Sequence, residues 1–117
     1  MNDIKMLAED LAKMINEGKI LEAFDKYYAD DVVMQENEDA ARAGKATNRE
    51  HEEAFVNGIT EMREMKMLGV AVGDNYSTLE YSMDATHKDW GVMKMSQVAV
   101  QTWKDGKVVK EKFYYNK

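Results

Sequence analysis

Glu36, His87 and Glu111 are the residues of this 117-residue chain on which proton-transfer chemistry could rest. Glu36 ends a β-like stretch that begins at Val32, His87 ends a segment of alternating polarity, and Glu111 lies inside another. A carboxylate surrounded by apolar side chains loses solvation, so its pKa rises toward neutrality and it becomes a useful base. Two carboxylates in one cavity would separate into one acid and one base, with a histidine as proton donor or shuttle.

Each of these residues also has a purely structural interpretation. Glu36 can sit at a strand end in solvent, and Glu111 can pair with Lys110 or Lys112. His87 precedes a turn and can be held there by local hydrogen bonds. The sequence leaves both interpretations open.

Composition excludes several other kinds of chemistry. The chain has no cysteine, which excludes disulfides and thiolate sites, and its two histidines, His51 and His87, are far apart. We expect His51 at the surface, and we expect neither a metal nor a cofactor. The net charge is -6 and the basic residues are scattered, so nucleic acid is not an expected partner. No apolar run reaches the ~20 residues of a membrane span, so we expect no membrane association and a cytoplasmic location.

The positions of apolar residues predict three helices. The first runs over residues 3–16, capped by Asn2 or Asp3, and Gly18 ends it before a second helix follows. A capping box from Thr47 to Glu50 opens the third. The apolar stripe of this third helix comprises Phe55, Gly58, Ile59 and Met62.

Alternating polarity between turn residues predicts five strands. They span residues 32–36, 66–73, 76–87, 92–103 and 108–115, and a loop covers 37–46. Three helices cannot cover both faces of a flat sheet of this size. We therefore expect one α+β domain over residues 1–117, with a strongly curved sheet wrapped around the helices.

Several short motifs, in this order, resemble the SnoaL-like polyketide cyclases and ketosteroid isomerases. They are Asn16-Glu17-Gly18-Lys19, Tyr28-Ala29-Asp30-Asp31-Val32-Val33, Arg42-Ala43-Gly44-Lys45-Ala46, Thr86-His87 and Trp103-Lys104-Asp105-Gly106-Lys107-Val108-Val109. The resemblance covers about residues 15–115 and is closest to a SnoaL-like branch without an assigned activity. It implies the cone-shaped fold of the nuclear transport factor 2-like superfamily, a cystatin-like α+β roll: three N-terminal helices on a strongly curved mixed or antiparallel sheet. It also implies a pocket for a small apolar organic ligand.

The resemblance places the general base of the ketosteroid isomerases on Glu36, and alternation along the strands then predicts which side chains face the pocket. Predicted catalytic residues are Glu36, Glu111 and His87. Predicted ligand-binding residues are Tyr28, Phe55, Tyr81, Met83, Met95, Gln97, Gln101, Phe113 and Tyr115. The family's oxyanion-hole tyrosine and second catalytic aspartate fall on Leu11 and Ala99, which supply no donor, so steroid isomerisation is excluded.

Two functions remain compatible with this pattern. One is a domain that binds a neutral, in some cases polycyclic, molecule carrying a ketone or hydroxyl group, with lyase, isomerase or cyclase chemistry through the predicted acids. The other is a non-catalytic dimerisation or protein-interaction domain. A homodimer through the convex sheet face is expected because that face is predicted to carry apolar residues. These are Leu68, Val70, Val72, Val92, Val98 and Val100.

Overall fold

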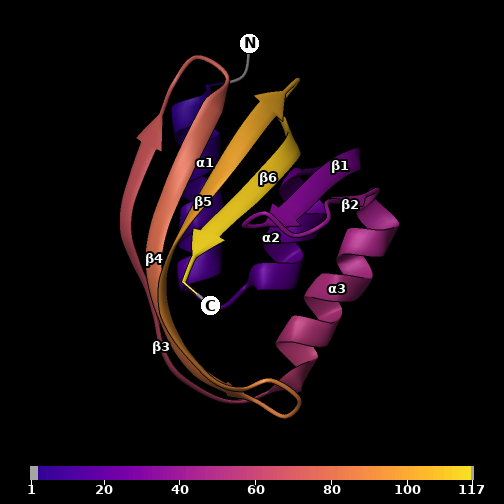
Figure 1. The fold of residues 1–117 in the computed structure, drawn as a ribbon. Helices are drawn as coiled ribbons and strands as arrows, with labels where there is room; N and C mark the ends of the chain where they lie inside the picture. Colours follow the sequence, from indigo (N-terminus) through magenta and orange to yellow (C-terminus); the bar gives the residue numbers. More distant parts are fainter. Residues whose placement is uncertain (1–2, 117) are drawn as a thin grey trace.

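The computed structural model describes residues 3–116, which form three helices and one six-stranded mixed sheet (Figure 1). The helices are α1 (Ile4–Asn16), α2 (Ile20–Tyr27) and α3 (Lys45–Gly58). The strands are β1 (Tyr28–Glu36), β2 (Arg42–Ala43), β3 (Ile59–Val72), β4 (Tyr76–His87), β5 (Gly91–Lys104) and β6 (Lys107–Tyr115). Their order across the sheet is β2-β1-β6-β5-β4-β3, and β1 runs parallel to β6. The α+β fold expected from the sequence is confirmed.

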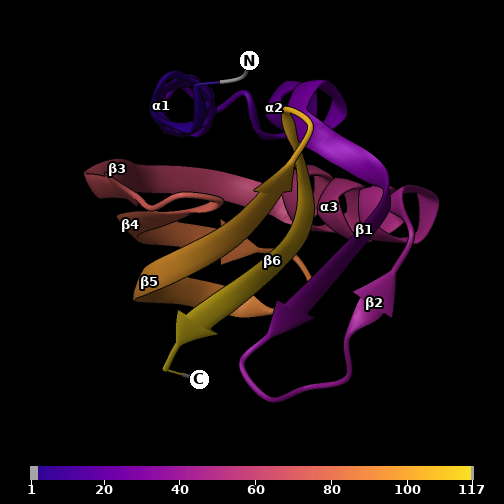
Figure 2. The same cartoon turned by 90° about the horizontal axis from the view of Figure 1, so that it is seen from above.

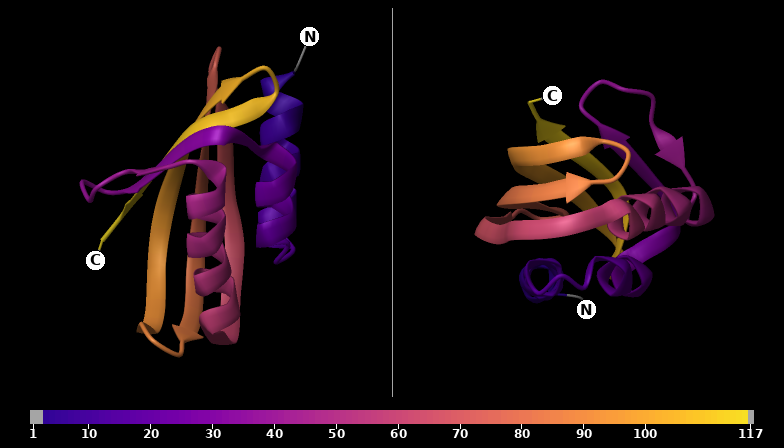
Figure 3. Two further views of the ribbon diagram at one scale, coloured as in Figure 1. Left: turned by 90° about the vertical axis from the view of Figure 1, so that its right-hand side faces the viewer. Right: turned by 90° about the horizontal axis from the view of Figure 1, so that it is seen from below.

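The sheet is strongly bent and does not close, and the helices lie on its concave side (Figure 1). Figure 2 shows α1 and α2 side by side, and α1 packs against β3 and β4. Figures 1 and 3 show α3 apart from that pair, where the long strands curl over at the β4–β5 turn. There the backbone amide of Lys88 donates to the carbonyl of Gly58 at 2.8 Å. No helix within residues 3–116 is both long and apolar enough to cross a bilayer.

The first two helices form as their sequence predicts. Asp3 caps α1, since its carboxylate accepts from the backbone amides of Lys5 at 3.0 Å and Met6 at 3.4 Å. Gly18 adopts φ +82°, which an L side chain rarely tolerates, and this lets the chain turn directly into α2. The apolar faces of both helices, with Leu11 and Phe24 fully or almost fully buried, build the core beneath the sheet.

The third helix differs from its prediction at both ends. It begins at Lys45 rather than at a Thr47 capping box, with Gly44 as an N-cap that offers no side chain. Asn48 instead stabilises this turn, because its buried amide donates to the carbonyls of Arg42 at 3.0 Å and Gly44 at 2.9 Å. The helix ends at Gly58, where the ring of His87 packs so closely that a Cβ would overlap it.

Strand β3 begins at Ile59, seven residues before the predicted start, so Ile59 and Met62 belong to the sheet rather than to α3. The prediction failed because the register with β4 shifts three times, which leaves Thr60, Arg63 and Leu68 as extra residues. Each such bulge breaks the two-residue alternation by which a strand is recognised. The short strand β2, which pairs with β1, lies in the segment predicted as a loop.

The bulge at Leu68 also corrects the predicted convex face. Beyond it Val70 pairs with Leu79 and Val72 with Ser77, whose side chains are buried beneath the sheet. Val70 and Val72 therefore lie on the concave side, where they border a groove beside α1. Leu68 and Val92 remain on the convex face and are 48% and 70% exposed.

Candidate functional site

A cavity of about 170 Å³ lies between the concave face of the sheet and the three helices. Side chains from α1, α2, α3, β1, β3, β4, β5 and β6 line it, together with Trp90 of the β4–β5 turn. Half of the lining residues are aromatic or methionine. Within residues 3–116 no lysine or arginine lines it, and its polar groups are few. Such a lining is typical of pockets for small organic molecules.

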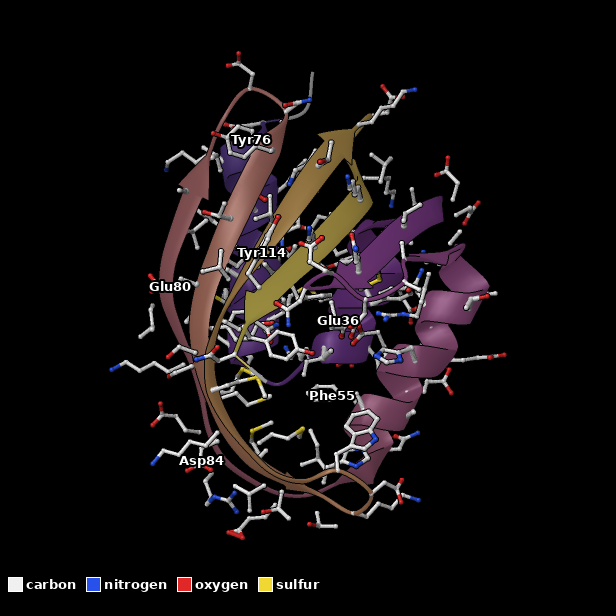
Figure 4. The ribbon with its side chains drawn as sticks, in the orientation of Figure 1. Glu36, Phe55, Tyr76, Glu80, Asp84 and Tyr114 are labelled. Carbon is white, nitrogen blue, oxygen red and sulfur yellow. The ribbon has the colours of Figure 1, made fainter. Side chains whose placement is uncertain are left out.

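The structure brings most of the predicted site residues together in this cavity. Those that line it are Tyr28, Glu36, Phe55, Tyr81, Met83, Met95, Gln97, Glu111, Phe113 and Tyr115. Figure 4 shows Glu36 and Phe55 in the space between α3 and the sheet, with Glu80 and Asp84 on the outer face. Strands β4 and β5 pair without any register shift, which is why alternation placed their inward side chains correctly. His87 and Gln101 do not belong to the lining.

Glu111 is held at the cavity wall by a directional chain of buried hydrogen bonds. The indole of Trp103 can only donate, and it does so to Ser77 Oγ at 2.8 Å. Ser77 must then donate its own proton to Gln101 Oε1 at 2.7 Å, which fixes the orientation of the amide. Gln101 Nε2 therefore donates to Glu111 Oε2 at 2.6 Å. Tyr28 donates to the other carboxylate oxygen at 2.5 Å.

Glu111 therefore accepts a hydrogen bond at each carboxylate oxygen, and its side chain also lines the cavity. Burial raises the pKa of Glu111 to about 7, and the charge of Glu36 adds to this rise. The hydrogen bonds from Gln101 and Tyr28 oppose it, because they stabilise the ionised form. Glu111 therefore exchanges a proton near neutral pH. The alternative pairing with Lys110 or Lys112 does not occur, since Glu111 points inward.

Glu36 lies in the same cavity but in a different electrostatic environment. Arg42 Nη1 donates to Glu36 Oε2 at 2.7 Å, and His51 Nε2 lies 3.7 Å from Oε1. Arg42 is in turn oriented by the Asn48 side chain through a 3.1 Å bond from Nε. The sequence-based expectation of a carboxylate walled only by apolar groups is wrong here, because β2 carries a guanidinium to it. Glu36 is an ion-paired acceptor at the cavity wall.

His87 has a structural environment rather than a place in the cavity. Its Nδ1 accepts from the Asp89 amide at 3.1 Å, so the ring proton belongs on Nε2, which lies 3.0 Å from the Ala54 carbonyl. The ring is sandwiched between Gly58 and Trp90, with ring centroids of His87 and Trp90 3.8 Å apart. Both nitrogens are occupied, so the geometry gives no support to the catalytic role expected for His87. It positions Trp90 instead.

Glu52 lines the cavity although it was not among the predicted site residues. It lies on α3 four residues after Asn48 and three before Phe55, so all three share one inward face. That helical spacing was the available signal, but the predicted inner stripe of this helix contained no acidic residue. The carboxyl group of Glu52 makes no hydrogen bond or ion pair with any of residues 3–116. Burial, followed by the charges of Glu111 and Glu36, raises the pKa of Glu52 to about 8.

Two further lining residues were not expected there. His51, predicted at the surface, lines the cavity, and burial and the charge of Arg42 lower the pKa of its ring below the usual value. Trp90, from a turn that was predicted only as a connection, lines the cavity while remaining 49% exposed. It therefore marks the side on which the cavity approaches solvent. Neither residue could be placed without knowing that the β4–β5 turn reaches α3.

The arrangement provides one carboxyl group that is mostly protonated at neutral pH, Glu52, and one that is close to half-ionised, Glu111. Both belong to the lining of one largely apolar cavity. Proton transfer to and from a bound organic molecule is the chemistry that such a pair can perform. Within residues 3–116 no group of acidic or histidine side chains gathers in a metal-binding arrangement.

Comparison with known proteins agrees with this architecture. No curated protein matches the chain in sequence. A protein from Mesorhizobium loti, assigned as a SnoaL-like polyketide cyclase and also named a carbohydrate phosphatase, superposes with a TM-score of 0.88 at 27% identity, over 97% of this chain and 100% of that one. A protein from Jannaschia, also assigned as a SnoaL-like polyketide cyclase, gives 0.78 at 10% identity over 99% and 90%. An NTF2-like protein of unknown function from Burkholderia pseudomallei gives 0.78 at 12% identity over 99% and 92%.

The sequence itself carries the family signature along almost its whole length. The model of the SnoaL-like domain matches residues 3–115, which include every helix and strand described above. This confirms the resemblance noted from the short motifs. The chain belongs to the SnoaL-like domain family.

Proposed function

We propose that this chain binds a small neutral organic molecule that carries a ketone or hydroxyl group, and that Glu111 exchanges a proton with it. The observation that carries the proposal is the position of Glu111, a buried carboxylate fixed by Tyr28 and Gln101 at the wall of an apolar cavity. The assignment of the Mesorhizobium loti and Jannaschia proteins as polyketide cyclases supports chemistry of the cyclase, isomerase or lyase class. His87 is not part of this proposal.

The size and charge of the cavity narrow the ligand class. An engineered cavity of ~150 Å³ in another protein binds benzene, so about 170 Å³ accommodates one or two rings. A polycyclic molecule would extend out of the cavity past the half-exposed side chain of Trp90. Anions are disfavoured, because the lining holds three glutamates and no lysine or arginine among the described residues.

A thermal-shift screen tests the ligand class. Neutral aryl ketones and alcohols are expected to raise the melting temperature, whereas nucleotides and sugar phosphates are not. A ligand at about a hundred times its dissociation constant adds ~2.7 kcal/mol, which is several degrees for a chain of this size. Gln97→Leu removes a polar group from the cavity and should reduce the shifts. Shifts from phosphates alone, lost on changing surface lysines and unaffected by Gln97→Leu, would contradict the proposed site.

The competing function, a non-catalytic dimerisation domain, rests on the convex sheet face. Leu68, Val92 and Tyr114 are exposed there, and Tyr114 pairs with the half-buried Val98. We propose that two copies pair through this face, which would cover these side chains. The cavity lies on the opposite face, so binding and pairing are compatible.

Light scattering at micromolar concentration should give twice the mass of one chain. Val92→Lys places a charge at the most exposed of these apolar positions and should shift the population toward single chains. Met6→Lys, at an apolar position of α1 that is 68% exposed and away from this face, is the control. A wild-type mass equal to one chain would end the dimer proposal.

A further inference from the structure

Tyr81 carries a hydroxyl proton for which residues 3–116 provide no acceptor. The residue is 8% exposed and lines the cavity from β4. Gln97 Nε2 donates to the Tyr81 hydroxyl oxygen, so the phenol's own proton must be directed elsewhere. The hydroxyl donates no hydrogen bond to any of residues 3–116. A buried donor left unpaired is unfavourable, and an acceptor on a bound ligand would remove that cost.

Among residues 3–116, Glu52 is a second polar residue of the cavity lining whose side chain has no hydrogen-bond partner. It approaches from α3, on the other side of the cavity from the sheet, and its carboxyl has no partner within residues 3–116. Tyr81 and Glu52 interact electrostatically, both interact with Glu111, and all three residues line the same cavity. In its protonated form Glu52 is a hydrogen-bond donor.

We propose that the ligand is held by one carbonyl oxygen, which accepts hydrogen bonds from the Tyr81 hydroxyl and from the Glu52 carboxyl. A carbonyl oxygen has two lone pairs and no proton, so it satisfies two converging donors at once. An ammonium group offers no acceptor for the Tyr81 proton, and a carboxylate would meet three glutamates. This inference rests on the proposed function and assigns to it a substrate class, small aryl or alkyl carbonyl compounds. The donors come from β4 and α3 rather than from positions 11 and 99.

The charge state of Glu52 gives this binding mode a distinct pH dependence. The titratable groups around Glu52 are Glu111 on β6, Glu36 and Tyr28 on β1, Arg42 on β2, Tyr81 on β4, and His51 and Arg49 on α3 itself. Burial and the neighbouring carboxylates outweigh the two arginines, so the pKa of Glu52 is about 8. A carbonyl ligand therefore keeps its affinity at neutral pH and loses it as pH rises beyond about 8, where the donor proton is lost.

Acetophenone and α-methylstyrene provide a matched pair of probes, because they differ in C=O against C=CH₂. Dissociation constants are measured by NMR titration of the backbone amides, with 1-phenylethylammonium as a charged analogue. Tyr81→Phe and Glu52→Leu are each expected to weaken acetophenone about tenfold, the equivalent of one hydrogen bond, and to leave α-methylstyrene unchanged. Glu52→Gln keeps a donor that cannot ionise. It should retain acetophenone at neutral pH and abolish the loss of affinity in alkali.

The expected outcomes distinguish failure of the carbonyl site from failure of the proposal that the cavity binds a small organic molecule. If both probes bind the wild-type protein and neither Tyr81→Phe nor Glu52→Leu distinguishes them, the cavity binds apolar molecules and the carbonyl site is wrong. Tighter binding of the ammonium, rising with pH and lost in Glu52→Gln, would make Glu52 a counter-ion and overturn the inference. No saturable binding of any probe would overturn both proposals. Far-ultraviolet circular dichroism of each variant confirms that it is folded.

Discussion

The free energy of unfolding is expected to fall as pH rises from about 5 to about 8, in contrast to proteins whose buried acids are ion-paired. Glu111 and Glu52 ordinarily titrate at 4.5, but in the folded chain their pKa values are about 7 and about 8. The folded state therefore holds protons that the unfolded state has already released. Their stabilising effect is complete below about pH 4.5 and is lost as pH rises through the folded values.

The expected loss is on the order of several kcal/mol, because a pKa that differs by one between the folded and unfolded states corresponds to ~1.4 kcal/mol and two interacting acids contribute. Urea unfolding at a series of pH values measures it. Glu52→Gln should match the wild type near pH 5 and exceed it near pH 8, since the variant has one fewer acid to ionise in the cavity. Glu53→Gln is the control, because Glu53 is exposed on the outer side of α3. A wild-type stability that stays level or increases between pH 5 and 8 would contradict the assigned proton affinities.

Gln101→Leu is expected to destabilise the fold by roughly 3–5 kcal/mol. The change removes the acceptor of the Ser77 hydroxyl and one donor to Glu111 at once, and all three side chains are almost completely buried. Each buried group left unpaired costs on the order of 1–3 kcal/mol. Loss of a donor to the ionised form should also raise the pKa of Glu111, so the destabilisation should be greater at alkaline pH than in acid.

Gln97→Leu provides a matched control for this prediction. It is the same substitution on the same strand and the same face of β5, but Gln97 faces the cavity, and among residues 3–116 its side chain bonds only to Tyr81. Its expected cost is about 1 kcal/mol, the net value of one hydrogen bond. Urea unfolding of both variants measures the two losses of unfolding free energy. Equal losses of stability would show that the chain from Trp103 to Glu111 is not a cooperative unit.

The parts of this protein that could be predicted from its sequence are those governed by local periodicity. Helical spacing and Gly18 defined the first two helices, and uninterrupted alternation placed Tyr81 and Met83 inside. The family resemblance placed Glu36 in the pocket, alternation then placed Glu111 there, and both line the cavity. These inferences succeed because an element without bulges repeats the same geometry along its whole length.

Other features depend on tertiary structure, because alternation along one strand does not predict bulges or contacts between separate elements. The bulge at Leu68 reversed the facing of Val70 and Val72, because one inserted residue exchanges the two faces of a strand. The ion pair of Glu36 depends on Arg42 of β2, and the role of His87 depends on the end of α3. The properties of the candidate site depend on burial and on groups from separate elements. The proton affinities of Glu52 and Glu111 arise only when α3, β1 and β6 enclose both carboxyls in the same apolar space.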